Sequence, residues 1–129
     1  MSGSAAAVQV FGRKDSRETQ RALRFFKERR IPVSFVDVGT KPPAPTELRR
    51  FSERLGARAL LDERGKAYAD QGLAYLRMDD AEVFERLLRD TRLLRLPLVR
   101  AGSRVVAGVD EPGWKELVSS LADASREAR

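Results

Sequence analysis

Short apolar runs alternate with amphipathic segments in the first third of the chain. Residues 8–11 and 33–38 are rich in valine and phenylalanine, which favour β-strands. The segment between them carries one face at helical spacing, made of Thr19, Ala22, Leu23 and Phe26. This periodicity predicts a helix over 16–30. A strand, a helix and a second strand in close succession predict a βαβ unit, with two parallel strands and a right-handed crossover.

The middle of the chain has the pattern of several short helices. Residues 39–45 form a Pro-rich connector that interrupts regular structure. Helical periodicity then predicts a helix over 46–55, short helical pieces over 57–72, and a helix over 80–90 capped by Asp79. On the first of these helices we expect Leu48, Phe51 and Leu55 to face inward.

Strands return in the last third of the chain. Apolar residues predict strands over 98–100 and 104–107, and the glycine in the turn 101–103 lets them form a hairpin. A final helix is expected over 111–124, with Trp114 on its buried stripe. The order βαβ, helical insertion, β-hairpin and helix is that of a thioredoxin-like α/β fold. We therefore predict a four-stranded mixed sheet with helices on both faces.

One domain accounts for this pattern, as the length of 129 residues suggests. We expect it to span 8–125, with the helical insertion at 42–90, a flexible tail at 1–7 and a frayed end at 126–129. Pro97 stands just before the third predicted strand. The inferred fold predicts a cis-proline there, facing the turn after the first strand, and a strand-start proline is the alternative.

Composition narrows the chemistry. The chain has no cysteine and no histidine, which excludes disulfides, thiol catalysis and Cys-type zinc sites and removes the commonest general base. The acidic residues lack metal-ligand spacing and the glycines form no phosphate loop, so we expect no metal and no cofactor. The net charge of +6 suits an anionic partner or a solvated basic surface. No signal peptide or membrane-spanning run is visible, so we expect a cytoplasmic protein.

The turn after the first strand is the candidate site. Asp15 followed by Glu18 fits an acidic relative of the capping box, which makes Asp15 the predicted N-cap and puts Ser16 on the first helical turn. Unpaired N–H groups and the helix dipole favour an anion there. In thioredoxin-like folds this junction holds a reactive thiolate, because the dipole lowers the pKa of a cysteine. Ser16 therefore marks either a thiol site without its sulfur or a serine selected for capping alone.

Four local matches, in this order, resemble the arsenate reductase (ArsC)/Spx family of thioredoxin-fold proteins over nearly all of residues 8–121. The matches are Ser16-Arg17-Glu18-Thr19, the Pro-Pro connector before Glu47-Leu48, Gly65-Lys66-Ala67-Tyr68 with Gly72-Leu73, and Arg95-Leu96-Pro97-Leu98-Val99 with Gly102, Gly108 and Trp114. The last group is close to the family's Arg-x-Pro signature before the hairpin. The resemblance implies the same fold as the element order.

The resemblance also implies site residues. The family's reductases carry a nucleophilic cysteine in the first helical turn, and Spx-type regulators carry Cys-x-x-Cys there. The closest register puts Ser16 on the cysteine position, and Arg13 is the alternative register. Of the arginines that bind the oxyanion in the reductases, only Arg95 has a clear counterpart, whereas Asp62 falls near another and would repel arsenate. The implied site is Ser16 with Arg95 and Pro97.

Basic residues around the first helix extend this site. The anion-binding set that we expect is Arg13, Lys14, Arg17 and Arg95. Further arginines and lysines follow along the helix, which is typical of a contact face for an acidic partner or of a solvated surface. No aromatic residues interleave with these charges, so direct nucleic-acid binding is not expected.

These observations favour a redox-inactive binding or regulatory module of the ArsC/Spx family. One alternative is a glutaredoxin- or thioredoxin-coupled oxidoreductase, similar to arsenate reductase, whose cysteine was lost or engineered away. Another is a Spx-like transcriptional regulator that binds RNA polymerase. The expected partners are an oxyanion or a small thiol in the pocket at the first helix, and as proteins the C-terminal domain of the RNA polymerase α subunit or a redoxin.

Overall fold

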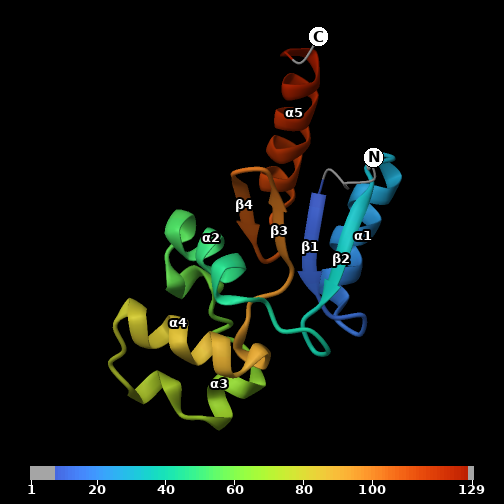
Figure 1. The fold of residues 1–129 in the computed structure, drawn as a ribbon. Coiled ribbons are helices and arrows are strands. Elements are labelled where there is room, and N and C mark those ends of the chain that lie inside the picture. The colour runs from blue at the N-terminus through green and yellow to red at the C-terminus, as the bar shows by residue number, and fades with distance from the viewer. Residues whose placement is uncertain (1–7, 128–129) are drawn as a thin grey trace.

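Four strands form one mixed sheet in the order β2-β1-β3-β4 (Figure 1). The strands are β1 (Val8–Gly12), β2 (Val33–Asp37), β3 (Leu98–Ala101) and β4 (Arg104–Ala107). β1 pairs in parallel with β2 and antiparallel with β3, and β3 pairs antiparallel with β4. The computed structural model describes residues 8–127, with side chains for 8–123. The predicted four-stranded mixed sheet is confirmed.

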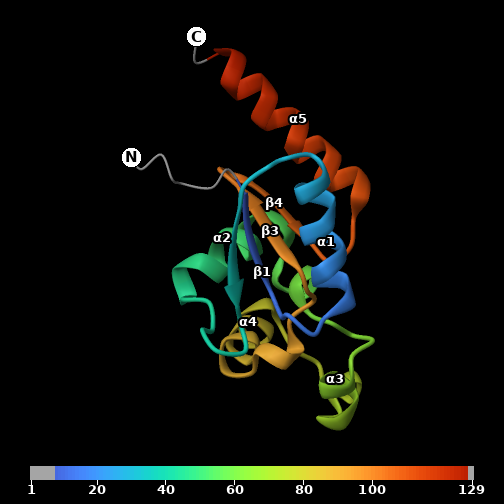
Figure 2. The ribbon, with the colours of Figure 1, turned by 90° about the vertical axis from the view of Figure 1, so that its right-hand side faces the viewer.

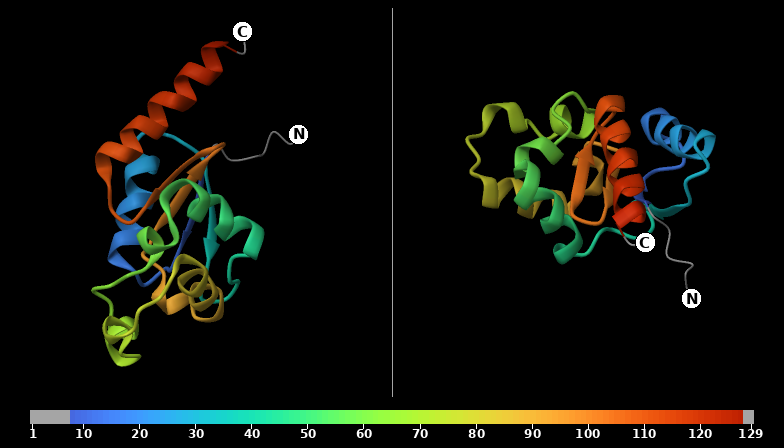
Figure 3. Two further views of the ribbon diagram at one scale, coloured as in Figure 1. Left: turned by 90° about the vertical axis from the view of Figure 1, so that its left-hand side faces the viewer. Right: turned by 90° about the horizontal axis from the view of Figure 1, so that it is seen from above.

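Helices cover both faces of this sheet. They are α1 (Arg17–Glu28), α2 (Pro45–Leu55), α3 (Lys66–Asp70), α4 (Asp80–Arg89) and α5 (Glu111–Glu127), with short 3₁₀ turns η2 (Ala57–Leu60), η3 (Leu73–Tyr75) and η4 (Thr91–Leu93). Figure 2 shows α1 and α5 on one side of the sheet and α2 and α4 on the other. α3 lies below the sheet, and the far end of α5 extends beyond it (Figure 3).

The alternation of side chains along the strands divides the core in two. Val8 and Val10 of β1 point toward α1 and α5, where Trp114 packs against Phe25 with ring centroids 5.3 Å apart. Phe11 points to the other face and meets Phe51 of α2 edge to face, at 5.8 Å. Because β1 has a neighbouring strand on each side, both halves of the core are built around it.

Several element boundaries differ from those that the sequence predicted. α1 ends at Glu28 and not at 30, since Arg30 adopts a left-handed conformation with φ of 58°. α5 continues through Glu127, so it includes two residues of the end that was expected to fray. The predicted tail at 1–7, like residues 128–129, lies outside the described residues.

Leu55 corrects the predicted inward face of the second helix. Leu48 and Phe51 are buried as expected, but the side chain of Leu55 at the end of α2 is 37% exposed. The last turn of α2 lies next to β4 (Figure 1), and none of the described elements covers Leu55 completely. An apolar side chain is therefore left facing solvent at this point of the fold.

Asp90 links the pieces of the helical insertion. Its carboxylate accepts hydrogen bonds from the backbone N–H of Arg92 at 3.0 Å, from the Arg92 guanidinium at 2.8 and 2.9 Å, and from the Gln71 amide at 2.9 Å. These donors stabilise the charged form, the Arg92 side chain most of all, and they lower the pKa of Asp90 to about 2. The ends of α3 and α4 and the turn η4 are thereby held together.

The stability that is lost when this carboxylate is replaced should depend on pH. The folded-state pKa of Asp90 lies below the ordinary 3.8, so its contribution is present above pH 3.8 and disappears as the pH falls toward 2. We expect Asp90→Asn to lower the free energy of unfolding by about 1 kcal/mol at pH 7, a value reduced by the solvent exposure of Arg92. Denaturant unfolding at pH 7 and pH 2.5 measures the difference.

The matched control is Asp70→Asn, which removes an equal charge from an exposed pair with Lys66. It should change stability little at either pH. A loss for Asp90→Asn that stays the same at pH 2.5 would contradict the assigned role of the charge.

Candidate functional site

The turn between β1 and α1 presents Ser16 at the start of the helix. Ser16 has extended backbone angles, and its Oγ accepts a hydrogen bond from the Thr19 N–H at 3.1 Å, so Ser16 is the N-cap. The prediction of Asp15 as N-cap was wrong. The Asp15 carboxylate instead lies 3.4 Å from Nε of Arg13, which is near enough for an ion pair and leaves the capping position to the next residue.

Thr19 fixes this turn to the sheet. Its side chain is fully buried, and its Oγ1 accepts a hydrogen bond from the Arg13 N–H at 3.3 Å. Gly12 at the end of β1 allows the approach, because a Cβ at Gly12 would lie 2.5 Å from both Oγ1 and Cγ2 of Thr19. The start of α1 is therefore held against the end of the central strand.

The Ser16 hydroxyl is engaged on both sides. It accepts from Thr19 and donates to Oε1 of Glu18 at 3.3 Å. The carboxylate of Glu18 thus stands beside the position where an anion at the helix N-terminus would lie, and a like charge disfavours such an anion. The helix dipole and Glu18 act in opposite directions here.

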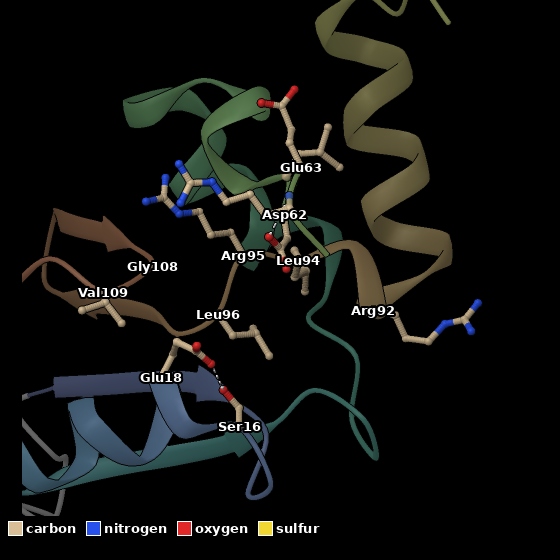
Figure 4. A pocket seen from close by; sticks show the side chains of 12 residues that line it. Ser16, Glu18, Asp62, Glu63, Arg92, Leu94, Arg95, Leu96, Gly108 and Val109 are labelled. Carbon is tan, nitrogen blue, oxygen red and sulfur yellow. Dashed lines mark hydrogen bonds between the residues drawn. The ribbon is translucent and has the colours of Figure 1, made fainter. Parts of the chain in front are cut away.

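A cavity of about 670 Å³ opens beside Ser16. Its lining comes from the start of α1, the loop after η2, the segment from η4 to Leu96, and the turn after β4 (Figure 4). The lining residues are Ser16, Glu18, Leu61, Asp62, Glu63, Arg64, Arg92, Leu94, Arg95, Leu96, Gly108 and Val109. The structure therefore brings Ser16 and Arg95, which are far apart in the sequence, to one cavity.

Pro97 holds one wall of this cavity in place without lining it. The Leu96–Pro97 peptide bond is cis, which confirms the cis-proline. Pro97 is buried, and its carbonyl accepts a hydrogen bond from the Gly108 N–H at 2.9 Å. The neighbouring Leu96 is the residue that reaches the cavity opposite the start of α1 (Figure 4).

Arg95 lies across the backbone of Gly108. A Cβ at Gly108 would lie 2.5 Å from Nε and 3.0 Å from Cζ of Arg95. The backbone N–H of Arg95 donates to the Leu60 carbonyl at 2.8 Å, which ties this segment to η2. The guanidinium is thus exposed but is supported along one side by a residue that has no side chain.

Charges of both signs line the cavity. The acidic side chains are Glu18, Asp62 and Glu63, and the basic ones are Arg64, Arg92 and Arg95. Arg92 is paired with Asp90, which raises the pKa of its guanidinium, and Figure 4 shows it pointing away from the centre. The wall at α1 is acidic, whereas Arg95 stands on the opposite wall. The cavity is thus polar and of mixed charge.

The remaining members of the predicted anion-binding set lie elsewhere. Arg13 is near Asp15, and neither Lys14 nor Arg17 contributes to the lining of this cavity. Lys14 and Arg17 are exposed on the turn and the first residue of α1. Of the four predicted residues, only Arg95 lines this cavity together with Ser16.

Two basic lining residues, Arg64 and Arg92, were missed by the sequence analysis. Arg64 follows η2, and Arg92 belongs to η4, so both depend on how the helical insertion folds back onto the α1 side. No motif marks either residue, and their place follows from tertiary packing alone.

The described residues contain no other obvious chemical centre. Within 8–127, no three side chains of the types that ligate metals come together. In the same part of the chain, no helix has both the length and the apolar character needed to cross a membrane.

Solved structures with the same fold define the class of this domain, which is thioredoxin-like. An arsenate reductase from Vibrio cholerae is similar with a TM-score of 0.73 and 18% identity, covering 89% of this chain and 98% of that one. A Bacteroides fragilis protein described as ArsC family related has a TM-score of 0.80 and 20% identity, with coverages of 88% and 98%. An arsenate reductase (ArsC) related protein from Brucella melitensis has a TM-score of 0.64 and 17% identity, with coverages of 87% and 94%.

The chain belongs to the ArsC family, whose sequence profile matches residues 11–117. That match includes the β1–α1 turn, the helical insertion and the segment around Pro97. No curated protein matches the chain in sequence. The predicted family is therefore confirmed, whereas the chemistry of the site must be argued from the residues that line it.

Two glycines provide a matched test of how Arg95 is placed. Gly108 and Gly102 both have left-handed backbones, with φ of 75° and 61°, but only Gly108 has a side chain against it. We expect Gly108→Ala and Gly102→Ala each to cost about 1 kcal/mol of stability, because both put a Cβ on a left-handed residue. Only Gly108→Ala should shift the Nε–Hε resonance of Arg95 in a ¹⁵N–¹H spectrum. An Arg95 resonance that responds equally to both would contradict the contact.

Proposed function

We propose that this ArsC-family protein is redox-inactive as its sequence stands and acts as a binding or regulatory module. The observation that supports the proposal is Ser16 at the N-cap of α1, in a chain that has no cysteine. In a thiol reductase, a thiolate at such a position attacks and forms a mixed disulfide. A serine oxygen forms no such intermediate, so this route is closed to the chain.

The neighbours of Ser16 do not supply a substitute chemistry. A serine becomes an effective nucleophile when a positioned base takes its proton, most often a histidine, and the chain has none. Glu18 accepts the hydroxyl proton in a hydrogen bond, but an exposed carboxylate is far too weak a base to generate an alkoxide. The same carboxylate and Asp62 would repel arsenate.

The cavity at α1 is the proposed binding site. Arg95 offers a guanidinium that can hold an oxyanion or the carboxylate of a small thiol through two parallel hydrogen bonds. Because Glu18 stands on the opposite wall, the anionic part of a ligand would lie at the Arg95 end.

A cytoplasmic location stays a prediction of the sequence.

A thiol-coupled arsenate reductase assay tests the loss of redox chemistry. We expect no turnover from the chain as it stands. Ser16→Cys should have a thiol pKa below the ordinary 8.5 or so, since the Thr19 N–H and the helix dipole favour a thiolate, with Glu18 limiting the shift. The double variant Ser16→Cys/Glu18→Gln should lower that pKa further, because a like charge is removed. The readout is the absorbance of the thiolate at about 240 nm, measured as a function of pH.

The outcomes distinguish a binding module from an oxidoreductase that lost its cysteine. Turnover by the unaltered chain would overturn the proposal. A strongly lowered pKa together with regained reductase activity in Ser16→Cys would favour the alternative of an oxidoreductase that lost its cysteine. A lowered pKa without any reductase activity in either variant would favour a pure binding module.

A second candidate is a Spx-like regulator that binds the C-terminal domain of the RNA polymerase α subunit. The observation that favours it is the exposed basic face of α1, which includes Arg17, Arg24 and Lys27. We expect a pull-down with that domain to weaken with salt if this face makes the contact. Absence of binding at every salt concentration would exclude this candidate, and a redoxin as bait tests the remaining protein partner.

A further inference from the structure

A groove follows the edge of the sheet at β4, away from Ser16. It consists of two adjoining cavities of about 420 and 340 Å³ that share Arg54, Ser103 and Val105 in their linings. Figure 3, left, looks toward this side of the sheet, with α5 and α2 on either side of β4. The groove shares only Arg95 with the cavity at α1.

The larger cavity runs along the strand edge. All four residues of β4 (Arg104–Ala107) line it, although their side chains alternate between the two faces of the sheet. A hollow that reaches both faces of one strand must pass over its edge. β4 ends the strand order and pairs only with β3 among the described strands, so its other edge has no strand partner there.

The register identifies which backbone groups face the groove. β3 and β4 are joined by a two-residue turn, so Ala101 and Arg104 form a hydrogen-bonded pair and the pairs alternate from there. The N–H and C=O groups of Val105 and Ala107 then point away from β3. Within the described residues, no side chain or loop is recorded as bonding to either of them. An extended chain could pair with β4 at these two residues.

Arginines dominate the charge of the groove. Five of them line the two cavities, namely Arg50, Arg54, Arg95, Arg100 and Arg104, against the acids Glu53, Asp110 and Glu116. The Asp110 carboxylate accepts a hydrogen bond from the Gly113 N–H at 3.0 Å, at the start of α5. Arg50 and Arg54 lie one helical turn apart on α2, a spacing at which like charges repel each other. This concentration of positive charge suits an acidic partner.

The floor of the groove is apolar but not aromatic. The exposed Leu55 lies in it together with Val106 and Leu117. No lining residue of either cavity is aromatic, and single-stranded nucleic acids are bound largely by stacking on aromatic side chains. Apolar contacts, a free strand edge and surrounding arginines together fit a peptide better than a nucleic acid.

We propose that β4 is a docking edge for an extended acidic peptide segment, which adds a strand to the sheet between α2 and α5. Backbone hydrogen bonds to Val105 and Ala107 hold the segment, and acidic side chains meet Arg50, Arg54 and Arg104. Apolar side chains at alternate positions cover Leu55 or Leu117. The proposal does not depend on what the cavity at α1 binds.

The test uses a defined probe, acetyl-Glu-Val-Glu-Val-Glu-amide, titrated into the ¹⁵N-labelled full chain. We expect the amide resonances of Val105 and Ala107 to shift. Two analogues are N-methylated, one at the valines and one at the glutamates. Since only alternate N–H groups of a paired strand face its partner, one analogue should lose binding while the other keeps it.

Charge reversal supplies the matched variants. Arg54 lines both cavities. The substitution Arg54→Glu should weaken binding of the acidic peptide by about tenfold, equivalent to about 1.4 kcal/mol. Arg89→Glu makes the same charge change at an exposed residue in the last turn of α4, the position that Arg54 has on α2. It should leave the affinity within about twofold, because Arg89 lines neither cavity and salt screens its distant charge. The unfolding midpoints of both variants establish that each one folds.

Several results would overturn the proposal. These are no shift at Val105 and Ala107, equal behaviour of the two N-methylated analogues, equal binding of a lysine-valine peptide, or equal effects of Arg54→Glu and Arg89→Glu. A ten-residue oligothymidylate that bound the same residues more tightly than the peptide would assign the groove to nucleic acid and also contradict it.

Discussion

The packing of Thr19 against Gly12 is the contact on which the candidate site depends. β1 lies between β2, with which it pairs in parallel, and β3, with which it pairs antiparallel. Its end is therefore held from both sides of the sheet. A buried threonine placed within van der Waals reach of a residue without a side chain transfers that support to the start of α1. This packing fixes the position of Ser16, the N-cap, relative to Leu96 and Arg95 on the other side of the cavity.

A fixed helix N-terminus does not by itself decide the chemistry. The Thr19 N–H, which would help to stabilise a thiolate here, donates to the Ser16 oxygen, and that hydroxyl donates to Glu18. One N–H group of the helix start is thus satisfied by the cap itself, without a ligand. The difference between a reactive site and a cap therefore lies in one side chain and its acidic neighbour, while the supporting contacts remain those of the fold.

Sequence patterns predicted what depends on short-range periodicity. The four strands, the hairpin turn and the Asp79 cap follow from spacing and turn chemistry, and the element order pointed to a cis-proline at Pro97. Asp15 and Ser16 are both good N-caps, and only the Thr19 N–H decides between them. Leu55 continues the apolar stripe of α2, but the described elements leave it 37% exposed. The places of Arg64 and Arg92 depend on long-range packing, which periodicity does not describe.

Arg95 connects the two surfaces of the molecule. Arg95 lines both the cavity at α1 and the groove along β4, and its side chain lies against Gly108. One side chain cannot make its full set of hydrogen bonds to two ligands at once. An anion held at α1 would draw Arg95 away from the groove and lower the positive charge there, and an acidic segment on β4 would do the reverse. By linkage the two effects would be equal in free energy. They would change the affinity of each surface for its ligand, but neither surface needs the other to be occupied in order to bind.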